Sequence, residues 1–133
     1  MDDAALLSLD YIYAPSADVA ADARWFTDVL GAQLVFAIES SGTRVAMLRL
    51  GTSGPPILVT DHLPDDRPIL VYRVASVVDA SASLRESGRT PDRTLELPMG
   101  PAVTFHGPGG IRLAIYEATR PFVVESMTGR RDF

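Results

Sequence analysis

The pattern of hydrophobic and polar residues divides the chain into short strands and two helices. Residues 7–14 alternate and are rich in aromatic side chains, which predicts a strand with Tyr11 and Tyr13 on one face. A helix is predicted next, because Asp18 is suited to cap its start, Gly31 is suited to end it, and apolar residues recur between them at helical spacing. Turn residues then separate three further predicted strands, over 33–39, 44–50 and 56–62.

The second half of the chain repeats this order of elements. Two prolines and several charges over residues 63–68 predict a linker, after which residues 69–74 form a strand. Ser76 is suited to cap a second helix and Gly88 to end it. Three more strands are predicted over 94–97, 101–106 and 111–117, with a glycine-rich turn before the last. An internal repeat of this kind usually means two modules that build one sheet system.

The tail over residues 121–133 follows the second repeat. Its apolar residues Phe122, Val123 and Val124 are suited to packing on the domain or on a partner. Residues 128–133 are predicted to be frayed, as the last residues of a chain often are.

Composition narrows the chemistry that the chain can carry. The 133 residues include no Cys, no Asn and no Lys, so all 12 basic residues are arginine, and His62 and His106 supply the imidazoles. Without Lys there is no side-chain Schiff base and no Walker-type phosphate loop. Without Cys there is no thiol nucleophile, disulfide, iron–sulfur cluster or thiolate zinc site.

The net charge and the lengths of the apolar runs limit the kinds of partner that the chain is expected to bind. The net charge is −5 and the arginines are scattered, which argues against a nucleic-acid or anionic-membrane surface. No apolar run approaches the ~20 residues of a membrane span. The acidic start over residues 1–3 is unlike a secretory signal. We therefore expect a cytoplasmic protein that forms a single domain over residues 1–133.

Two segments carry a resemblance to a known family. The helix sequence DVAADARWFTDVLG over residues 18–31 has an Asp cap, an aromatic pair and a terminal Leu-Gly, and FHGPGG over residues 105–110 precedes the last predicted strand. Together with the repeat, these segments resemble the vicinal oxygen chelate superfamily, which includes glyoxalase I, extradiol dioxygenases and bleomycin-resistance proteins. The resemblance covers about residues 7–120.

The resemblance implies a fold and an assembly. It implies an α+β fold with two βαβββ modules, about 7–63 and 68–120, that form a curved, mostly antiparallel sheet with the helices on its convex face. The tail over 121–133 would follow the second module. Single chains of this family often form dimers, so the resemblance also implies a homodimer.

The resemblance also locates the positions where metal-dependent members hold their ion. By distance from the shared motifs, these positions are Tyr11, Leu58, Ile69 and Ala114 in this sequence. A divalent ion needs several nitrogen or oxygen ligands that converge on one site, and of these four only the tyrosine could bind a metal. The resemblance therefore favours the branch without a metal or other cofactor.

A ligand-binding cavity is the function that these positions favour. We predict a metal-independent protein of the bleomycin-resistance type, rather than an enzyme, that sequesters a hydrophobic or aromatic small molecule. Tyrosine rings would stack on the ligand, and arginine would read an acidic group on it or pair with a carboxylate at the rim. The predicted lining residues are Tyr11, Tyr13, Leu58, Val71, Arg73, Ala114 and Tyr116.

Two alternatives stay open from the sequence. The first is an enzyme of the same superfamily, a glyoxalase-like lyase or isomerase or a dioxygenase, with a displaced metal site or with metal-free catalysis through Tyr11, His62 or His106. The second is a regulatory or interaction module, whose own side chains would fill the cavity.

Overall fold

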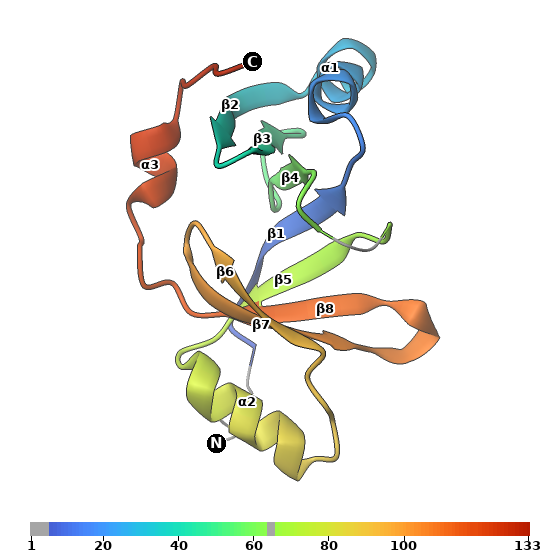
Figure 1. Ribbon diagram of the computed structural model, residues 1–133, viewed down its shortest axis with the longest axis vertical. Helices are drawn as coiled ribbons and strands as arrows, with labels where there is room; N and C mark the ends of the chain where they lie inside the picture. Colours follow the sequence, from blue (N-terminus) through green and yellow to red (C-terminus); the bar gives the residue numbers. More distant parts are fainter. Residues whose placement is uncertain (1–5, 64–65) are drawn as a thin grey trace. The chain divides into compact units, whose positions relative to one another are not determined.

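A computed structural model describes residues 6–63 and 66–133, which divide into two units that each combine a helix with a sheet (Figure 1). We call them the N-unit, which comprises Tyr11–Pro68 with Glu125–Phe133, and the C-unit, which comprises Ile69–Val124 with the described residues up to Asp10. The acidic start over 1–3 and the middle of the predicted linker, residues 64 and 65, lie outside the described residues.

The N-unit is built from the first βαβββ repeat. Strand pairing gives the order β2-β3-β4-β1, with β1 and β4 parallel and the other two pairs antiparallel. Edge strand β2 therefore lies at one side of this sheet. In chain order the elements are β1 (Ser8–Pro15), which enters the N-unit at Tyr11, α1 (Val19–Leu30), β2 (Gln33–Ser40), β3 (Thr43–Arg49) and β4 (Ile57–Thr60).

Helix α1 begins and ends as the sequence predicts. The Asp18 side chain accepts a hydrogen bond from the amide of Ala21 at 3.1 Å, and Gly31 ends the helix with φ 68°. Val19 and Ala23 face the sheet, where they join a buried cluster with Ala46, Leu48 and Val59. The apolar face of α1 thus covers one face of β3 and β4. The opposite face of that sheet points away from α1.

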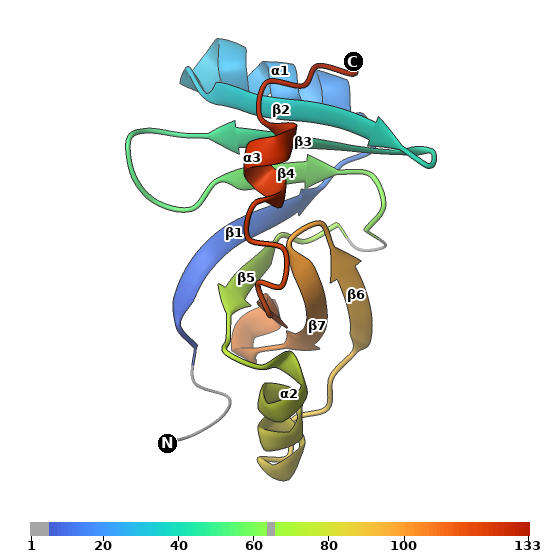
Figure 2. The ribbon, with the colours of Figure 1, turned by 90° about the vertical axis from the view of Figure 1, so that its left-hand side faces the viewer.

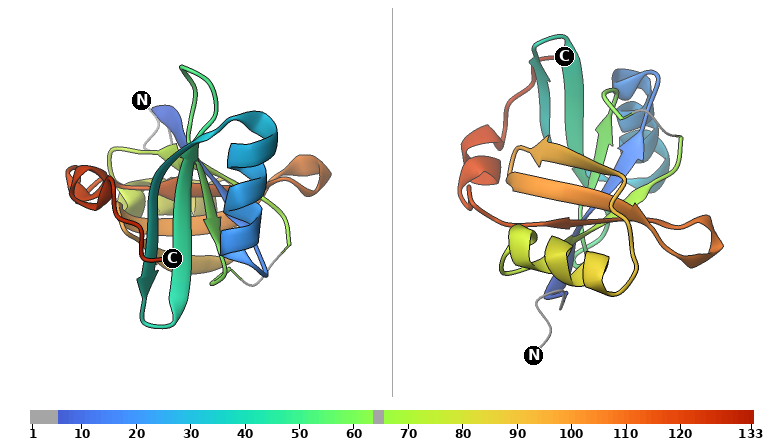
Figure 3. Two further views of the ribbon diagram at one scale, coloured as in Figure 1. Left: turned by 90° about the horizontal axis from the view of Figure 1, so that it is seen from above. Right: turned by 60° about the horizontal axis from the view of Figure 1, so that its bottom comes forward.

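The C-unit is built from the second repeat. Its strand order is β5-β8-β7-β6, with β5 and β8 parallel and the other pairs antiparallel. Ser76 caps α2 by accepting a hydrogen bond from the Asp79 amide at 3.2 Å, and α2 packs on one face of β7 and β8 (Figure 3). Its elements are β5 (Ile69–Arg73), α2 (Val77–Glu86), β6 (Arg93–Leu97), β7 (Gly100–His106), a 3₁₀ turn (Pro108–Gly110) and β8 (Arg112–Tyr116).

The end of the chain differs from its prediction. A short helix, α3 (Val123–Met127), is followed by residues that run beside β2 (Figure 2). The Ala37 amide donates to the Arg130 carbonyl at 2.9 Å, and the Asp132 amide donates to the Ala37 carbonyl at 2.7 Å. The prediction that residues 128–133 are frayed is therefore wrong, because backbone groups of this segment are paired with a sheet edge.

The α+β class and the two βαβββ repeats are confirmed. Antiparallel pairs outnumber parallel ones within each unit, as predicted for the sheet. In the part of the chain that the structure describes, no helix has the length and apolar character that crossing a membrane requires.

Candidate functional site

The N-unit has a sheet face that points away from α1, and two of the predicted site residues lie on it. Tyr13 on β1 is the register partner of Leu58 on β4, and Leu58 is the partner of Met47 on β3. Neighbouring residues on these strands, such as Val59 and Leu48, pack with α1, so side chains alternate between the two faces. Tyr13 is 1% exposed, and Leu58 and Met47 are fully buried.

The Tyr13 hydroxyl is the unusual polar group of this face. It is buried, and it has no hydrogen-bond partner among the residues that the structure describes. Burial strongly raises the pKa of the phenol, and the nearby Tyr11 raises this pKa further. The hydroxyl is therefore neutral at ordinary pH, and it can donate a hydrogen bond but cannot serve as a base. An unsatisfied buried group of this kind costs about 1–3 kcal/mol, so it needs an explanation.

A second polar pair lies on the same face of β4. Thr60 is fully buried, and its hydroxyl lies 2.6 Å from Nδ1 of His62. Since Thr60 is two residues after Leu58 on the strand, it shares the face that bears Tyr13. The hydrogen bond holds the His62 ring beside the end of this strand.

Three of the four positions that the resemblance assigns to metal ligands carry hydrocarbon side chains. Leu58, Ile69 and Ala114 carry hydrocarbon side chains that are at most 2% exposed, and hydrocarbon has no lone pair to offer a cation. Across residues 6–63 and 66–133, no three His, Cys, Asp or Glu side chains come together in a group that could hold an ion.

The C-unit carries the other four predicted site residues. Val71 is the register partner of Ala114, and Arg73 is the partner of Tyr116. Val71, Ala114 and Tyr116 are buried, whereas the Arg73 side chain is about half exposed.

Asp10 joins two of these residues and was missed by the sequence reasoning. Its Oδ2 accepts a hydrogen bond from the Tyr116 hydroxyl at 2.6 Å and lies 3.5 Å from Nε of Arg73. Its Oδ1 accepts a hydrogen bond from the Ser8 hydroxyl at 2.5 Å. Arg73 therefore faces a carboxylate of its own chain, which is the rim pairing that the sequence left open. The only signal was an acidic residue in a largely apolar strand.

His106 also has an acidic partner that the sequence did not indicate. Its Nδ1 lies 2.6 Å from Oδ2 of Asp92, and both side chains are partly exposed. A carboxylate on one ring nitrogen fixes the orientation of an imidazole and leaves the other nitrogen for proton exchange. The Asp92 carboxylate thus orients the His106 ring on a partly exposed part of the C-unit.

The seven predicted lining residues thus fall into two groups. Tyr11, Tyr13 and Leu58 belong to the N-unit, where the structure brings Tyr13 and Leu58 together. The other four belong to the C-unit, where they form two register pairs. That all seven line one cavity stays a prediction.

The fold is that of the vicinal oxygen chelate superfamily. Solved structures of methylmalonyl-CoA epimerases, which are members of that superfamily, share it. The epimerase from Mycobacterium tuberculosis matches with a TM-score of 0.69 and 20% identity, over 88% of this chain and 91% of that one.

Two further structures carry bound acyl-CoA compounds. A Streptomyces coelicolor methylmalonyl-CoA epimerase variant, in complex with 2-nitronate-propionyl-CoA, matches with a TM-score of 0.67 and 16% identity, over 86% of this chain and 99% of that one. A methylmalonyl-CoA epimerase in complex with methylmalonyl-CoA and NH4+ matches with a TM-score of 0.67 and 15% identity, over 87% and 97%. At these identities the likeness shows the fold. No family model matches the sequence, and no curated protein sequence matches it.

Proposed function

We propose that this chain binds a small molecule with a carbonyl or similar acceptor, and acts on it as an enzyme of the vicinal oxygen chelate superfamily. The observation that carries the proposal is the buried Tyr13 hydroxyl, which lacks a hydrogen-bond partner among the described residues. A ligand oxygen placed against this hydroxyl would satisfy it. The hydrocarbon of Leu58 and Met47 on the same face would contact the apolar part of the ligand.

The chemistry of a neutral phenol suits a carbonyl substrate. A hydrogen bond to a carbonyl oxygen strengthens when that oxygen gains negative charge, as it does when a base, which would be a group other than Tyr13, accepts a proton from the adjacent carbon. Because its pKa is raised, Tyr13 would keep its own proton while it stabilises this charge. Structural neighbours that bind methylmalonyl-CoA and 2-nitronate-propionyl-CoA support a carbonyl compound of the acyl-thioester type. They favour an enzyme over the sequestering protein predicted from the sequence.

A sequestering protein of the bleomycin-resistance type is the second candidate. This candidate is favoured by the hydrocarbon side chains at three of the metal positions, because hydrocarbon cannot bind the ion that metal-dependent members use. The three residues are Leu58, Ile69 and Ala114. In both candidates we propose that binding requires no metal and no other cofactor. We further propose that the protein is a cytoplasmic homodimer.

A thermal-shift screen tests both candidates. The probes are methylmalonyl-CoA, the glutathione hemithioacetal of methylglyoxal, catechol and bleomycin, each with and without Mn²⁺. A ligand at 100 times its dissociation constant adds about 2.7 kcal/mol to the free energy of unfolding, which gives a clear rise in Tm. We expect a metal-independent rise with a carbonyl probe, and a much smaller rise in Tyr13→Phe. Tyr72→Phe, on β5, is the matched control and should respond like the unmodified chain.

Turnover of the bound probe separates the two candidates. Consumption of a carbonyl probe by the unmodified chain, at a rate that falls at least about tenfold in Tyr13→Phe, supports the enzyme. A stabilising probe that is recovered unchanged supports sequestration. A shift with Mn²⁺ alone, or equal probe binding by Tyr13→Phe, contradicts the proposed site.

A further inference from the structure

Thr60, at the end of β4, is a buried polar residue on the face of the N-unit sheet that bears Tyr13. It is fully buried, and it is the register partner of Val45 on β3 and of Pro15 on β1. The hydrogen bond that the structure gives its hydroxyl joins it to Nδ1 of His62 at 2.6 Å. A buried hydroxyl is costly unless it is hydrogen-bonded, so this bond accounts for a threonine on a largely apolar face.

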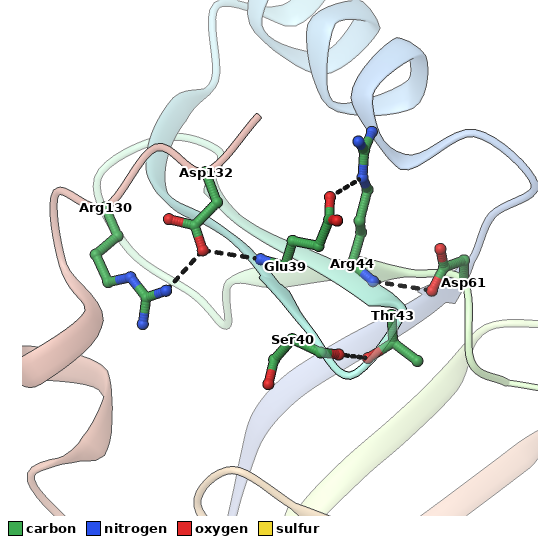
Figure 4. Close-up of polar contacts among 7 residues, drawn as sticks. All are labelled: Glu39, Ser40, Thr43, Arg44, Asp61, Arg130 and Asp132. Atoms are coloured by element: carbon green, nitrogen blue, oxygen red, sulfur yellow. Dashed lines mark hydrogen bonds and ion pairs between the residues drawn. The ribbon is translucent and has the colours of Figure 1, made fainter.

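The backbone that leads to His62 is fixed to β3 by the residue before it. Oδ1 of Asp61 accepts a hydrogen bond from the Arg44 amide at 3.0 Å (Figure 4). The Asp61 amide in turn donates to the Arg44 carbonyl at 3.4 Å. These bonds continue the pairing of β3 and β4 by one residue past the end of β4. The His62 ring is thus held at two points, by the fixed backbone before it and by the Thr60 hydroxyl.

The spacing along β4 suits a small molecule that contacts Tyr13 and the imidazole together. Leu58 is the register partner of Tyr13, and Thr60 follows Leu58 two residues later on the same face. Two residues of a strand span about 7 Å between their Cα atoms. Two polar contacts of about 3 Å each, with a carbonyl group between them, cover a distance of this size. His62 is an exposed residue, so a ligand can reach its ring.

The partner of Nδ1 determines the chemistry that is possible at Nε2 of the ring. A threonine hydroxyl can accept the Nδ1 proton of both the neutral and the protonated imidazole. In the neutral ring, a proton on Nδ1 leaves a lone pair on Nε2, and that lone pair can take up a proton. The bond to Thr60 therefore suits an imidazole that gains and loses a proton at Nε2.

We propose that His62 is the base of the reaction proposed at Tyr13, and that Thr60 positions it. Nε2 of His62 accepts the proton from the carbon next to the ligand carbonyl. The electron pair of the broken C–H bond forms the carbon–carbon double bond of an enolate, and the carbonyl π electrons move to the oxygen that Tyr13 contacts. Return of the proton from Nε2 to carbon completes the cycle without a co-reactant. This inference rests on the proposed function and assigns the base that the function requires.

Nitrogen NMR of the histidine rings tests the arrangement without any ligand. The chain has two histidines, so comparison with His62→Gln assigns the signals. At a pH at which both rings are neutral, we expect His62 to carry its proton on Nδ1 in the unmodified chain and in Thr60→Ser. In Thr60→Val we expect a mixture of the two tautomers. A proton on Nε2 in the unmodified chain would mean that Thr60 donates the bond, and it would overturn the proposal.

Exchange of the substrate proton for deuterium tests the chemistry. Methylmalonyl-CoA and the glutathione hemithioacetal of methylglyoxal each carry a hydrogen on a carbon next to a carbonyl, and its exchange in D₂O is followed by NMR. We expect the catalysed exchange to fall at least about 100-fold in His62→Gln. It should fall about tenfold in Thr60→Val and return in Thr60→Ser, because the serine hydroxyl can again hold the ring. The thermal shift that the probe produces should persist in His62→Gln, because Tyr13 still contacts the carbonyl.

The outcomes separate this inference from the function on which it rests. Exchange that persists in His62→Gln, or that is lost in His106→Gln instead, overturns His62 as the base and leaves binding at Tyr13 standing. A thermal shift that disappears in His62→Gln assigns this residue to binding and also overturns its role as the base. An unmodified chain that exchanges neither probe overturns the base and the enzymatic function together.

Discussion

The Tyr13 hydroxyl, which has no hydrogen-bond partner among the described residues, has a consequence for stability as well as for binding. Tyr13→Phe keeps the buried ring and removes a hydroxyl that residues 6–63 and 66–133 leave without a hydrogen bond. We expect the free energy of unfolding of the ligand-free protein to stay level or to rise by up to about 1–3 kcal/mol, measured by chemical denaturation. A loss of more than about 1 kcal/mol would show that the hydroxyl has a partner in the folded protein.

Gly100 is a position where any side chain would collide with the backbone. A Cβ built there would lie 1.9 Å from the carbonyl oxygen of Glu117, and φ is +155°. We expect Gly100→Ala to lower the free energy of unfolding by more than about 2 kcal/mol in a urea titration. Gly42→Ala is the control, because its added Cβ would meet no atom within 4 Å and only its positive φ would cost, about 1–2 kcal/mol. Equal losses at the two positions would contradict the collision.

At the scale of the elements, the caps account for where the helices begin. Asp18→Ala removes the hydrogen bond to the Ala21 amide at the first turn of α1. We expect a loss of about 0.5–2 kcal/mol in the free energy of unfolding. Asp28→Ala removes the same charge from the same helix without touching the cap, and should stay within about 0.5 kcal/mol. A similar loss in both variants would point to charge rather than to capping.

Residues 129–132, the tail strand that lies beside β2, should respond to acid through Asp132. The Glu39 amide and the Arg130 guanidinium lower the pKa of its carboxyl from 3.8 in the folded protein. Because the pKa of this carboxyl is lower in the folded protein than in the unfolded chain, its ionised form stabilises the docked tail strand at a pH above the ordinary pKa. This stabilisation is lost as the pH falls from the ordinary pKa through the lower pKa of the folded protein. We therefore expect the protection of the Asp132 and Ala37 amides against hydrogen exchange to fall below about pH 4. Asp132→Asn should remove this pH step, and a step that persists in Asp132→Asn would assign it to another group.

At the scale of the whole molecule, local patterns predicted the repeat but not the long-range contacts. The caps at Asp18 and Ser76 are short-range features, and they place both helices correctly. The bond between Glu39 and Asp132 joins residues 93 positions apart, and the bond between Asp10 and Tyr116 joins residues 106 apart. Such pairs depend on the register and connection of distant strands, which hydrophobic spacing does not encode.

The tail strand was missed for a related reason. It pairs largely through backbone groups, so its sequence carries no alternation of apolar and polar residues to mark it as a strand. The resemblance supplied the positions of Tyr13 and Leu58, which are register partners on β1 and β4. That they line a ligand cavity stays a prediction. That the Tyr13 hydroxyl finds no partner in the described part of the chain could only emerge from the three-dimensional surroundings of the ring.

The covered edge of β2 also bears on how the protein behaves in storage. Residues 120–122 are exposed, so a contaminating protease that cleaves there would separate the tail strand from the rest of the chain. The amides of Ala37 and Glu39 would then lose their partners, and an uncovered strand edge readily pairs with other chains. A clipped preparation is thus expected to become turbid on concentration while the intact protein stays clear, which makes integrity at this segment a practical measure of sample quality.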